Sequence, residues 1–425
     1  MKKNLALVMA LTLAFSLFAA PSAADVGGGT VRVWCWDPAF NLYAMEEAAK
    51  VYKEINPEFE IIIEEVPWDD IQTRLITIAN SGTYDDLPDI FLCQNNAFQK
   101  NMQSYPELFY DLTGSSIAFD EFPEGVLAFT IMDGRNYGVP FDNGTAINNV
   151  RTDVIAEAGY TIEDFTDITW TQFLARAKHV LTHTGKPMLS GVAGENDYIM
   201  VTLQSAGASL FDDEGNPYIA DNAELKAAIE VYGDLVQSGV FVEYNSWDEF
   251  IGSFTSGNVA GVLSGCWILG SVQTAQDQSG LWDITNLPKL RNVEGATNYS
   301  AWGGSSWGVS SSSKNPELAI DFLSKTFAGS VDFYATILGS AGAIANWMPA
   351  AGGDMYQQPQ PFFNDEPIYA RIIEYAARVP GSNTGVFYYE ARDAVGAAIQ
   401  QILAGADMDA ALREAEDAVN FAMGR

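Results

Sequence analysis

The sequence contains very few histidine, cysteine and basic residues. Its 425 residues include 2 His, 3 Cys and 22 Lys plus Arg, against 55 Asp plus Glu. The resulting net charge of −33 repels phosphate backbones and anionic lipid surfaces, so we expect no nucleic-acid partner. Hydrophobic residues still make up 48%, which is enough to build the cores of two or three domains.

Motifs for catalysis and metal binding are also missing. The sequence has no G-x-S-x-G nucleophile elbow and no H-E-x-x-H helix. His179 and His183 have the four-residue spacing of helical metal ligands, but the threonines around His183 and the following Gly185 indicate a solvated helix end. The carboxylates show no spacing that favours a glycosidase pair. We therefore expect no enzyme, no cofactor and no metal site.

A long hydrophobic run occurs only at the start of the chain. Lys2 and Lys3 precede a 14-residue apolar run over 5–18, and small residues around Ala24 suit a cleavage site. This pattern predicts a secretory signal peptide over residues 1–24, since a membrane span needs about 20 apolar residues. No cysteine for lipid attachment follows the run. We expect a periplasmic or secreted protein that does not insert into the membrane.

The three cysteines all lie in short β-type runs. Thiols in such runs usually serve as small buried hydrophobic groups, and an oxidising compartment leaves at least one of three unpaired. If a disulfide forms, Cys35–Cys93 is the expected pair, because their strands are predicted neighbours in one sheet, and Cys266 stays free.

Short apolar strands alternate with amphipathic helices over the first hundred residues. The pattern predicts strands at 30–36, 59–66 and 89–93, with helices at 41–55 and 69–81 between them. This succession predicts a parallel sheet with right-handed crossovers. Ligands of such sheets bind beyond the carboxyl ends of the strands.

The rest of the chain continues the α/β pattern. Turn formers break a strand at 138–144, and a glycine- and serine-rich stretch covers 300–313. Further strands are predicted at 145–150 and 259–264. Further helices are predicted at 169–183, 196–208, 222–237, 316–328, 330–338, 365–378, 386–404 and 408–422.

Several tryptophans lie beside turn residues at predicted strand ends. An indole face stacks on the C–H face of a sugar ring, while nearby Asp, Asn and Gln side chains pair with the sugar hydroxyls. The mixture occurs at Trp36-Asp37, Gln94-Asn95-Asn96, Asp142-Asn143 and Asn346-Trp347, with further tryptophans at Trp34, Trp267, Trp302 and Trp307. These clusters favour a carbohydrate site.

Six segments follow one another in a specific order along the chain. They are VRVWCWD, LPDIFLCQN with LFYDLT, DGRNYGVPFDNGTAINNVRTDV, FTSGNVAGVLSGCWILG, GGSSWGVSSSSKNPELAIDFLSKTF and ILAGADMDAALREAEDAVNFA. In this order they resemble the bacterial extracellular solute-binding proteins of family 1, the carbohydrate type related to maltose-binding protein. The chain departs from that pattern at Asn258, which replaces the usual basic residue, and at GCW, which replaces glycine-proline-tryptophan.

The resemblance implies an α/β fold of the two-lobe, type II periplasmic-binding-protein class. Each lobe would hold a mainly parallel sheet flanked by helices, with the ligand between the lobes. Lobe 1 would comprise 25–142 and 306–340, and lobe 2 would comprise 143–305 and 341–425. Hinge crossovers would lie near 142–145, 300–306 and 339–346.

The resemblance also implies the residues of the binding site. Trp267 would be the stacking tryptophan, and the others would come from the crossovers and the loops after the strands. The implied set is Trp36, Asp37, Asn95, Asn96, Asp142, Asn143, Asp197, Tyr198, Trp267, Gly303, Gly304, Ser305, Trp347 and Tyr388.

The function implied is that of a monomeric, non-catalytic receptor of an ABC importer. It would bind a mono- or oligosaccharide and deliver it to the transmembrane subunits of a permease, although delivery to a sensor stays open. Two alternatives also stay open. The acidic composition suits a receptor for a polyamine or another cationic solute, and tryptophans with carboxylates suit a secreted glycoside hydrolase.

Overall fold

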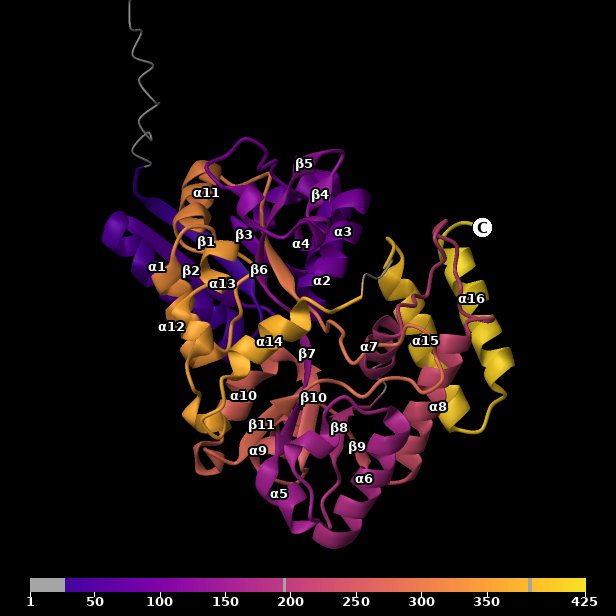
Figure 1. Cartoon of the computed structure of the whole chain (residues 1–425). Coiled ribbons are helices and arrows are strands. Elements are labelled where there is room, and N and C mark those ends of the chain that lie inside the picture. Colours follow the sequence, from indigo (N-terminus) through magenta and orange to yellow (C-terminus); the bar gives the residue numbers. More distant parts are fainter. Residues whose placement is uncertain (1–26, 194–195, 381–383) are drawn as a thin grey trace, which may run out of the picture.

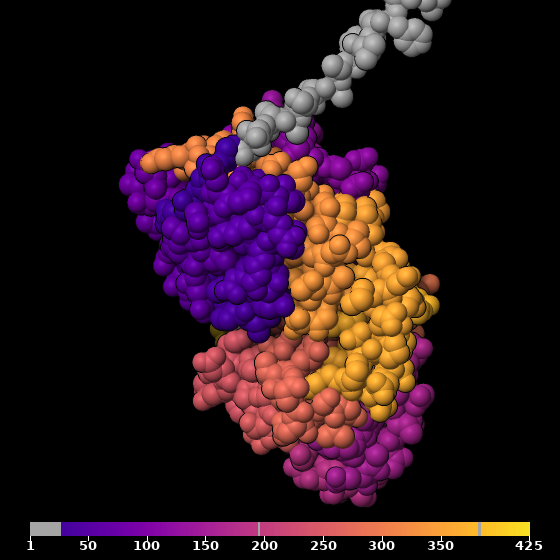
Figure 2. Space-filling view, turned by 90° about the vertical axis from the view of Figure 1, so that its left-hand side faces the viewer, coloured from indigo at the N-terminus to yellow at the C-terminus, as the bar shows by residue number. Residues whose placement is uncertain are grey.

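The computed structural model describes residues 27–193, 196–380 and 384–425, and the predicted signal peptide over 1–24 lies outside them. The chain forms two α/β lobes, one above the other in Figure 1. The indigo surface of the N-terminal lobe rests directly on the salmon surface of the other along one side (Figure 2). On this side α10 (Leu269–Gln273) of the second lobe contacts η1 (Pro38–Leu42) and α12 (Val331–Ala341) of the first.

Lobe 1 is built on a five-stranded sheet of order β2-β1-β3-β12-β6. Its strands are β1 (Gly29–Cys35), β2 (Phe59–Glu65), β3 (Ile90–Gln94), β6 (Gly138–Asp142) and β12 (Ser305–Val309). β1 pairs in parallel with β2 and β3, whereas β12 pairs antiparallel with β3 and β6. All the strands therefore run in one direction except β12, the strand that arrives from lobe 2.

Helices cover both faces of this sheet. One face buries Val31, Val33 and Cys35 against α1 (Tyr43–Ile55), α11 (Pro316–Lys325) and α12, and the other buries Trp34 and Phe91 against α2 (Trp68–Ser81) and α3 (Asn95–Ser104). The first core also takes in Ala345, Trp347 and Ala350, which lie beyond the boundary at 340 that the resemblance implied. The remaining elements of this part are η2 (Tyr84–Asp86), η3 (Pro106–Leu108), η4 (Phe119–Glu121), α4 (Glu124–Leu127), β4 (Ile131–Met132), β5 (Arg135–Asn136) and α13 (Met348–Ala351).

Lobe 2 repeats this arrangement on a smaller sheet. The strands β10 (Gly261–Gly265) and β11 (Trp282–Thr285) flank β7 (Ala146–Arg151), and both pair with it antiparallel. As in lobe 1, the strand that crosses from the other lobe, here β7, is antiparallel to both of its neighbours. A second pair, β8 (Leu189–Val192) and β9 (Phe241–Tyr244), is parallel.

The helices of lobe 2 pack on two cores on opposite sides of β7. α6 shows how the sequence sets their ends: Thr169 and Gln172 form a capping box at its start, and Gly185 ends it in the left-handed conformation at φ 72°. The helices are α5 (Thr152–Glu157), α6 (Trp170–Thr184), α7 (Asp197–Ser205), α8 (Ala223–Gln237), α9 (Trp247–Thr255), α10, α14 (Ile368–Ala376), α15 (Tyr388–Leu403) and α16 (Met408–Ala422). Short turns are η5 (Ile162–Phe165), η6 (Cys266–Ile268), η7 (Gln276–Gln278), η8 (Asp354–Gln357) and η9 (Pro361–Phe363).

The expectation that the cysteines are buried hydrophobic groups is confirmed, and the Cys35–Cys93 pairing, expected only if a disulfide formed, is not made. Cys35, Cys93 and Cys266 are all buried free thiols. β1 and β3 are neighbours as expected, but Cys35 lies in the core on one face of the sheet and Cys93 in the core on the other. Because strand side chains alternate between faces, adjacent strands alone do not bring two thiols together.

Two regular elements occur where the pattern did not predict them. Asn95 and Asn96, expected after strand 89–93, begin α3, and the glycine- and serine-rich stretch contains β12. Within the part of the chain that the structure describes, no helix is long and apolar enough to cross a bilayer.

Candidate functional site

Three segments cross between the lobes side by side. Asp142 bridges to Ala345, and Thr145 bridges to Ala301, each in antiparallel fashion. At their centre Gly144 packs on Gly303 so closely that a Cβ on Gly144 would lie 2.5 Å from the carbonyl carbon of Gly303. Only glycine fits at position 144, because any side chain would collide with backbone.

Asp142 holds these segments together from a buried position. Its Oδ1 accepts hydrogen bonds from the backbone N–H of Ser305 at 2.9 Å and from the Ser305 hydroxyl. Its backbone carbonyl accepts from Nδ2 of Asn346 at 2.6 Å. Burial raises the pKa of Asp142 to about 6, although the hydrogen bonds from Ser305 oppose this shift. The carboxyl thus links two of the crossing segments at the point where they enter the sheet of lobe 1.

Tryptophans gather where the crossing segments meet lobe 2. Nε1 of Trp267 donates to the carbonyl of Trp302 at 2.9 Å, and the rings of Trp247 and Trp267 lie 5.9 Å apart. Trp267 is half-buried and contacts the cores of both lobes. It therefore lies at the seam between the lobes.

A series of polar side-chain contacts begins at Trp302, one of these tryptophans. Nε1 of Trp302 donates to Asp197 at 3.0 Å, and Arg392 donates to the other carboxylate oxygen of Asp197 at 3.3 Å. The guanidinium of Arg392 also lies 5.0 Å from the ring centre of Tyr389. Burial alone would lower the pKa of Arg392, but the Asp197 carboxylate raises it overall, so the guanidinium stays charged.

Tyr389 extends this series of polar side-chain contacts to lobe 1. Its hydroxyl donates to Oε1 of Gln94 at 2.7 Å, and its ring lies 6.5 Å from that of Trp68, which packs edge-on against Trp36 at 5.1 Å. Figure 1 shows the start of α15 reaching toward α2 and α3. We call these residues the interlobe cluster: Trp36, Trp68, Gln94, Asp197, Trp247, Trp267, Trp302, Tyr389 and Arg392.

The structure brings some of the predicted site residues into this cluster. Trp36, Asp197 and Trp267 belong to it. Tyr388 is adjacent, with its ring 5.3 Å from Tyr389, and packs on the lobe 2 core. Gly303, Gly304 and Ser305 lie in the crossing segment that carries Trp302, with Gly304 at φ 91°.

Other predicted residues are engaged elsewhere. Asp37 accepts from the N–H of Ala39, and Asn143 accepts from that of Thr145. Asn95 is buried and accepts from the Ser306 hydroxyl, while Asn96 is half-buried in the first turn of α3.

Two predicted aromatic residues lie in the cores. The Tyr198 hydroxyl donates to the carbonyl of Ser190 within lobe 2, and Trp347 Nε1 donates to Glu121 in lobe 1. Tyr198 also packs edge-on against Trp302 of the interlobe cluster, with ring centres 5.2 Å apart, whereas Trp347 packs in the core of lobe 1.

Sequence reasoning missed Trp68, Trp247, Tyr389 and Arg392. Trp68 and Trp247 each begin a helix, and Tyr389 directly follows the predicted Tyr388. A tryptophan in a first helical turn was a signal that could have identified the first two.

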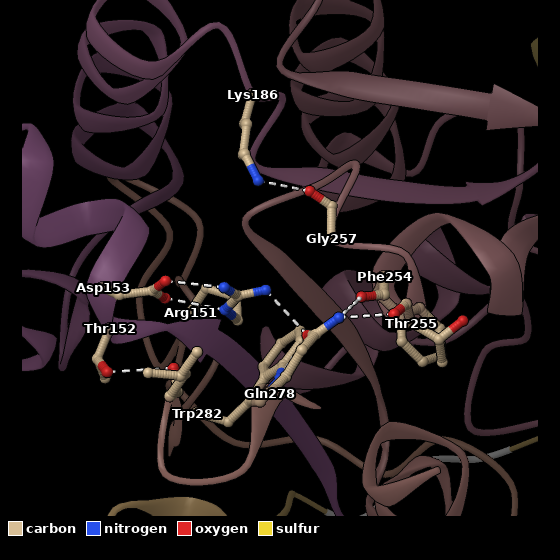
Figure 3. A network of polar contacts seen from close by, with 10 residues as sticks. Arg151, Thr152, Asp153, Lys186, Phe254, Thr255, Gly257, Gln278 and Trp282 are labelled. Carbon is tan, nitrogen blue, oxygen red and sulfur yellow. Dashed lines mark hydrogen bonds and ion pairs between the residues drawn. The ribbon is translucent and has the colours of Figure 1, made fainter. Parts of the chain in front are cut away.

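A second polar network lies in lobe 2, apart from the cluster (Figure 3). Gln278 accepts from Arg151 and from Trp282, and donates to the carbonyls of Phe254 and Thr255 at the end of α9. Lys186 donates to the carbonyl of Gly257 at 2.6 Å. Lys186 thereby places a positive charge at the helix end, next to Asn258, where the family pattern has a basic residue.

The two histidines lie together on α6. Their ring centres are 4.0 Å apart, and the position is exposed. Among residues 27–193, 196–380 and 384–425, no three His, Cys, Asp or Glu side chains gather as a metal site would require.

The chain belongs to the bacterial extracellular solute-binding proteins, because the model of that family matches residues 47–345. It is 38% identical over 92% of both chains to the lactose-binding protein of Rhizobium radiobacter. It is 24% identical to the arabinooligosaccharide-binding protein of Bacillus subtilis over 75% of this chain and 74% of the relative.

Solved structures confirm the two-lobe α/β fold. The ABC-transporter-associated binding protein of B. animalis subsp. lactis, in complex with β-1,6-galactobiose, matches with a TM-score of 0.78 at 18% identity, covering 93% of this chain and 97% of that one. The cyclic α-maltosyl-1,6-maltose binding protein of Arthrobacter globiformis matches with a TM-score of 0.70 at 25% identity, covering 93% and 98%.

Proposed function

We propose that this protein is the exported carbohydrate receptor of an ABC importer and has no catalytic activity. The observation that carries the proposal is the interlobe cluster, in which indole rings alternate with hydrogen-bonding side chains from both lobes. A sugar needs both, because its C–H faces stack on aromatic rings and each buried hydroxyl needs a partner.

The first ligand to test is lactose. The relative at 38% identity is a lactose-binding protein, and the more distant one binds arabinooligosaccharides. A disaccharide of neutral hexoses also suits the charges of the seam. Asp197 is paired with Arg392, and Glu390 with Lys100, so these carboxylates are already neutralised. This pairing argues for a neutral ligand over a polyamine.

The proposed mechanism follows from the division into two lobes that the resemblance implied, except that residues 341–351 pack mainly with lobe 1. The sugar first binds to the aromatic rings of lobe 2, and rotation about the crossing segments then brings Gln94 and Trp36 of lobe 1 over it. The monomeric receptor, held in the periplasm, presents this closed form to the transmembrane subunits of the permease. Ligand shifts the open–closed equilibrium only as far as its affinity for the two forms differs.

Calorimetry with lactose, an arabinooligosaccharide and spermidine tests the ligand class. We expect heat with a neutral saccharide and none with spermidine, and lactose recovered unaltered after long incubation. Spermidine binding alone would establish the cationic-solute alternative, and cleaved lactose would establish the hydrolase.

Replacing Trp267 by alanine tests the site. Trp267→Ala should weaken saccharide binding at least tenfold, because the stacking ring is lost while the half-buried position leaves the fold intact. Tyr218→Ala is the matched control, since Tyr218 is an aromatic residue of lobe 2 that is 40% exposed outside the interlobe cluster. Unchanged affinity in Trp267→Ala would remove this residue from the site.

A further inference from the structure

Glu390 joins the two lobes beside the interlobe cluster. It lies in the first turn of α15, and its Oε1 forms an ion pair with Nζ of Lys100 on α3. Both side chains are largely shielded, with 24% of Lys100 and 31% of Glu390 exposed. The neighbouring Tyr389 makes its own cross-lobe hydrogen bond to Gln94. Helix α15 of lobe 2 is therefore fastened to lobe 1 at two adjacent residues.

The second oxygen of the Glu390 carboxylate is unsatisfied. Oε2 is buried and has no hydrogen-bond partner among the described residues. The donors nearest along α15 are committed elsewhere, because the Tyr389 hydroxyl donates to Gln94 and Arg392 donates to Asp197. A buried carboxylate oxygen without a donor is unfavourable, so it marks a place where a hydroxyl group would be held strongly.

We propose that Glu390 couples ligand binding to closure: Oε1 holds Lys100 across the seam, and Oε2 accepts a hydrogen bond from a hydroxyl of the bound sugar. The inference rests on the proposed carbohydrate function. On this proposal, both oxygens of the Glu390 carboxylate have partners only when the lobes are closed and the sugar is bound. Loss of Lys100 then weakens sugar binding, and loss of the sugar weakens the closed form.

A double-mutant cycle separates the two roles. Lys100→Met removes only the ion pair, and Glu390→Met removes both acceptor oxygens while keeping a side chain of similar length. We expect Lys100→Met to weaken lactose binding several-fold in calorimetry. Adding Glu390→Met in the Lys100→Met background should weaken it by about a further tenfold. No further loss would mean that Glu390 serves the ion pair alone, and would overturn the proposal.

The reversed pair provides a second readout. In Lys100→Glu with Glu390→Lys, the ion pair is restored but the acceptor for the sugar hydroxyl is lost. Small-angle scattering at saturating lactose should show the compact closed form, while lactose affinity stays reduced. Recovery of wild-type affinity would contradict the proposal.

Deoxy sugars and a remote ion pair complete the test. One monodeoxylactose should bind more weakly than lactose to the wild type. The same analogue should bind as tightly as lactose to Glu390→Met, because its missing hydroxyl is the one that Glu390 accepts from. Lys226→Met is the matched control, since Lys226 pairs with Asp409 within lobe 2, and it should not change affinity. If the wild type binds no neutral saccharide, the proposed function fails and this inference fails with it. If lactose binds, and every deoxy analogue loses as much affinity relative to lactose in Glu390→Met as in the wild type, this inference alone fails.

Discussion

The two strands that cross into the opposite lobe occupy equivalent places but differ in the largest side chains that they bury. β12 enters the sheet of lobe 1 with Trp307 and Val309 in the apolar core, whereas β7 enters the sheet of lobe 2 with Asn148 and Asn149, both fully buried. Lobe 1 is therefore stabilised at its centre by aromatic packing. In lobe 2 the same place holds two buried amides between apolar residues such as Ile147 and Val150, and Asn149 donates to the carbonyl of Val262.

The comparison extends to the site. Lobe 2 supplies most of the rings of the interlobe cluster, together with the Asp197–Arg392 pair, while lobe 1 contributes Gln94 and Lys100 to the cross-lobe contacts. A rigid aromatic surface suits initial binding, and polar groups on the closing lobe suit recognition of hydroxyls. The variants below test this contrast, beginning with the largest expected effect.

Truncating the aromatic centre of lobe 1 should have the largest effect. Trp307 is fully buried, with its ring 5.5 Å from Phe141 and 5.2 Å from Phe327. Trp307→Ala should lower the free energy of unfolding by about 3–5 kcal/mol in denaturant titration, because it leaves a large cavity. Trp247→Ala, at a residue 39% exposed, should cost less than about 1 kcal/mol. Equal losses in the two variants would show that lobe 1 is not centred on Trp307.

The buried carboxyl of Asp142, at the crossing segments, should make stability depend on pH. Because the folded-state pKa of Asp142 is raised to about 6 from 3.8, the folded form holds its proton longer than the unfolded form. Stability contributed by this group is therefore full below pH 3.8 and falls as pH rises to 6, by about 3 kcal/mol. Asp142→Asn should remove this loss.

Unfolding of wild type and Asp142→Asn across pH 2–7 measures the difference directly and also covers the range in which the control titrates. Asp111→Asn is a control of opposite sign, since the Thr113 hydroxyl together with Arg135 lowers the pKa of Asp111. If the free energies of unfolding of wild type and Asp142→Asn differ by the same amount at every pH between 4 and 6, the raised pKa of Asp142 is refuted.

The polar network of Figure 3 should be the main support of the lobe 2 periphery. Gln278→Leu deprives Arg151 and Trp282 of their shared acceptor and two carbonyls of α9 of their donor. We expect a loss of about 2 kcal/mol in the free energy of unfolding. Gln276→Leu, at an exposed neighbour, should change it by less than about 0.5 kcal/mol. A neutral Gln278→Leu would show that lobe 2 does not depend on this network.

The smallest expected effect is an increase in stability on replacing Asn148. Both amide atoms of Asn148 are buried without hydrogen-bond partners among the described residues. Asn148→Val should therefore stabilise the protein by about 1 kcal/mol in thermal or denaturant unfolding. Asn149→Val should instead destabilise it, because Asn149 donates to the carbonyl of Val262 at 3.1 Å. Destabilisation by Asn148→Val would show that β7 needs its amide there.

Elements with a clear period were predicted well. The strands and helices of the first 94 residues match the expected ranges to within about two residues, because alternation and helical spacing are local properties. β12 was missed as a strand, since Ser305, Ser306 and Gly308 carry no strand pattern and pair only because β3 and β6 hold them on both sides.

The residues of the interlobe cluster were predicted less completely than the helices and strands, because the direction of a side chain depends on tertiary packing. A helix over 386–404 was expected, but successive residues on a helix point about 100° apart. Which of Tyr388 and Tyr389 faces lobe 1 depends on how α15 packs, and the structure turns Tyr389 toward Gln94 and Tyr388 toward the lobe 2 core.

The amino-acid sequence by itself determined the class of fold, the order of the elements and the kind of chemistry available, because periodicity, composition and motif order are written along the chain. Tertiary structure decided which side chains meet across the seam, from Tyr389 with Gln94 to Glu390 with Lys100. These partners lie nearly 300 residues apart in sequence, and only the packing of two lobes around three crossing segments brings them within bonding distance.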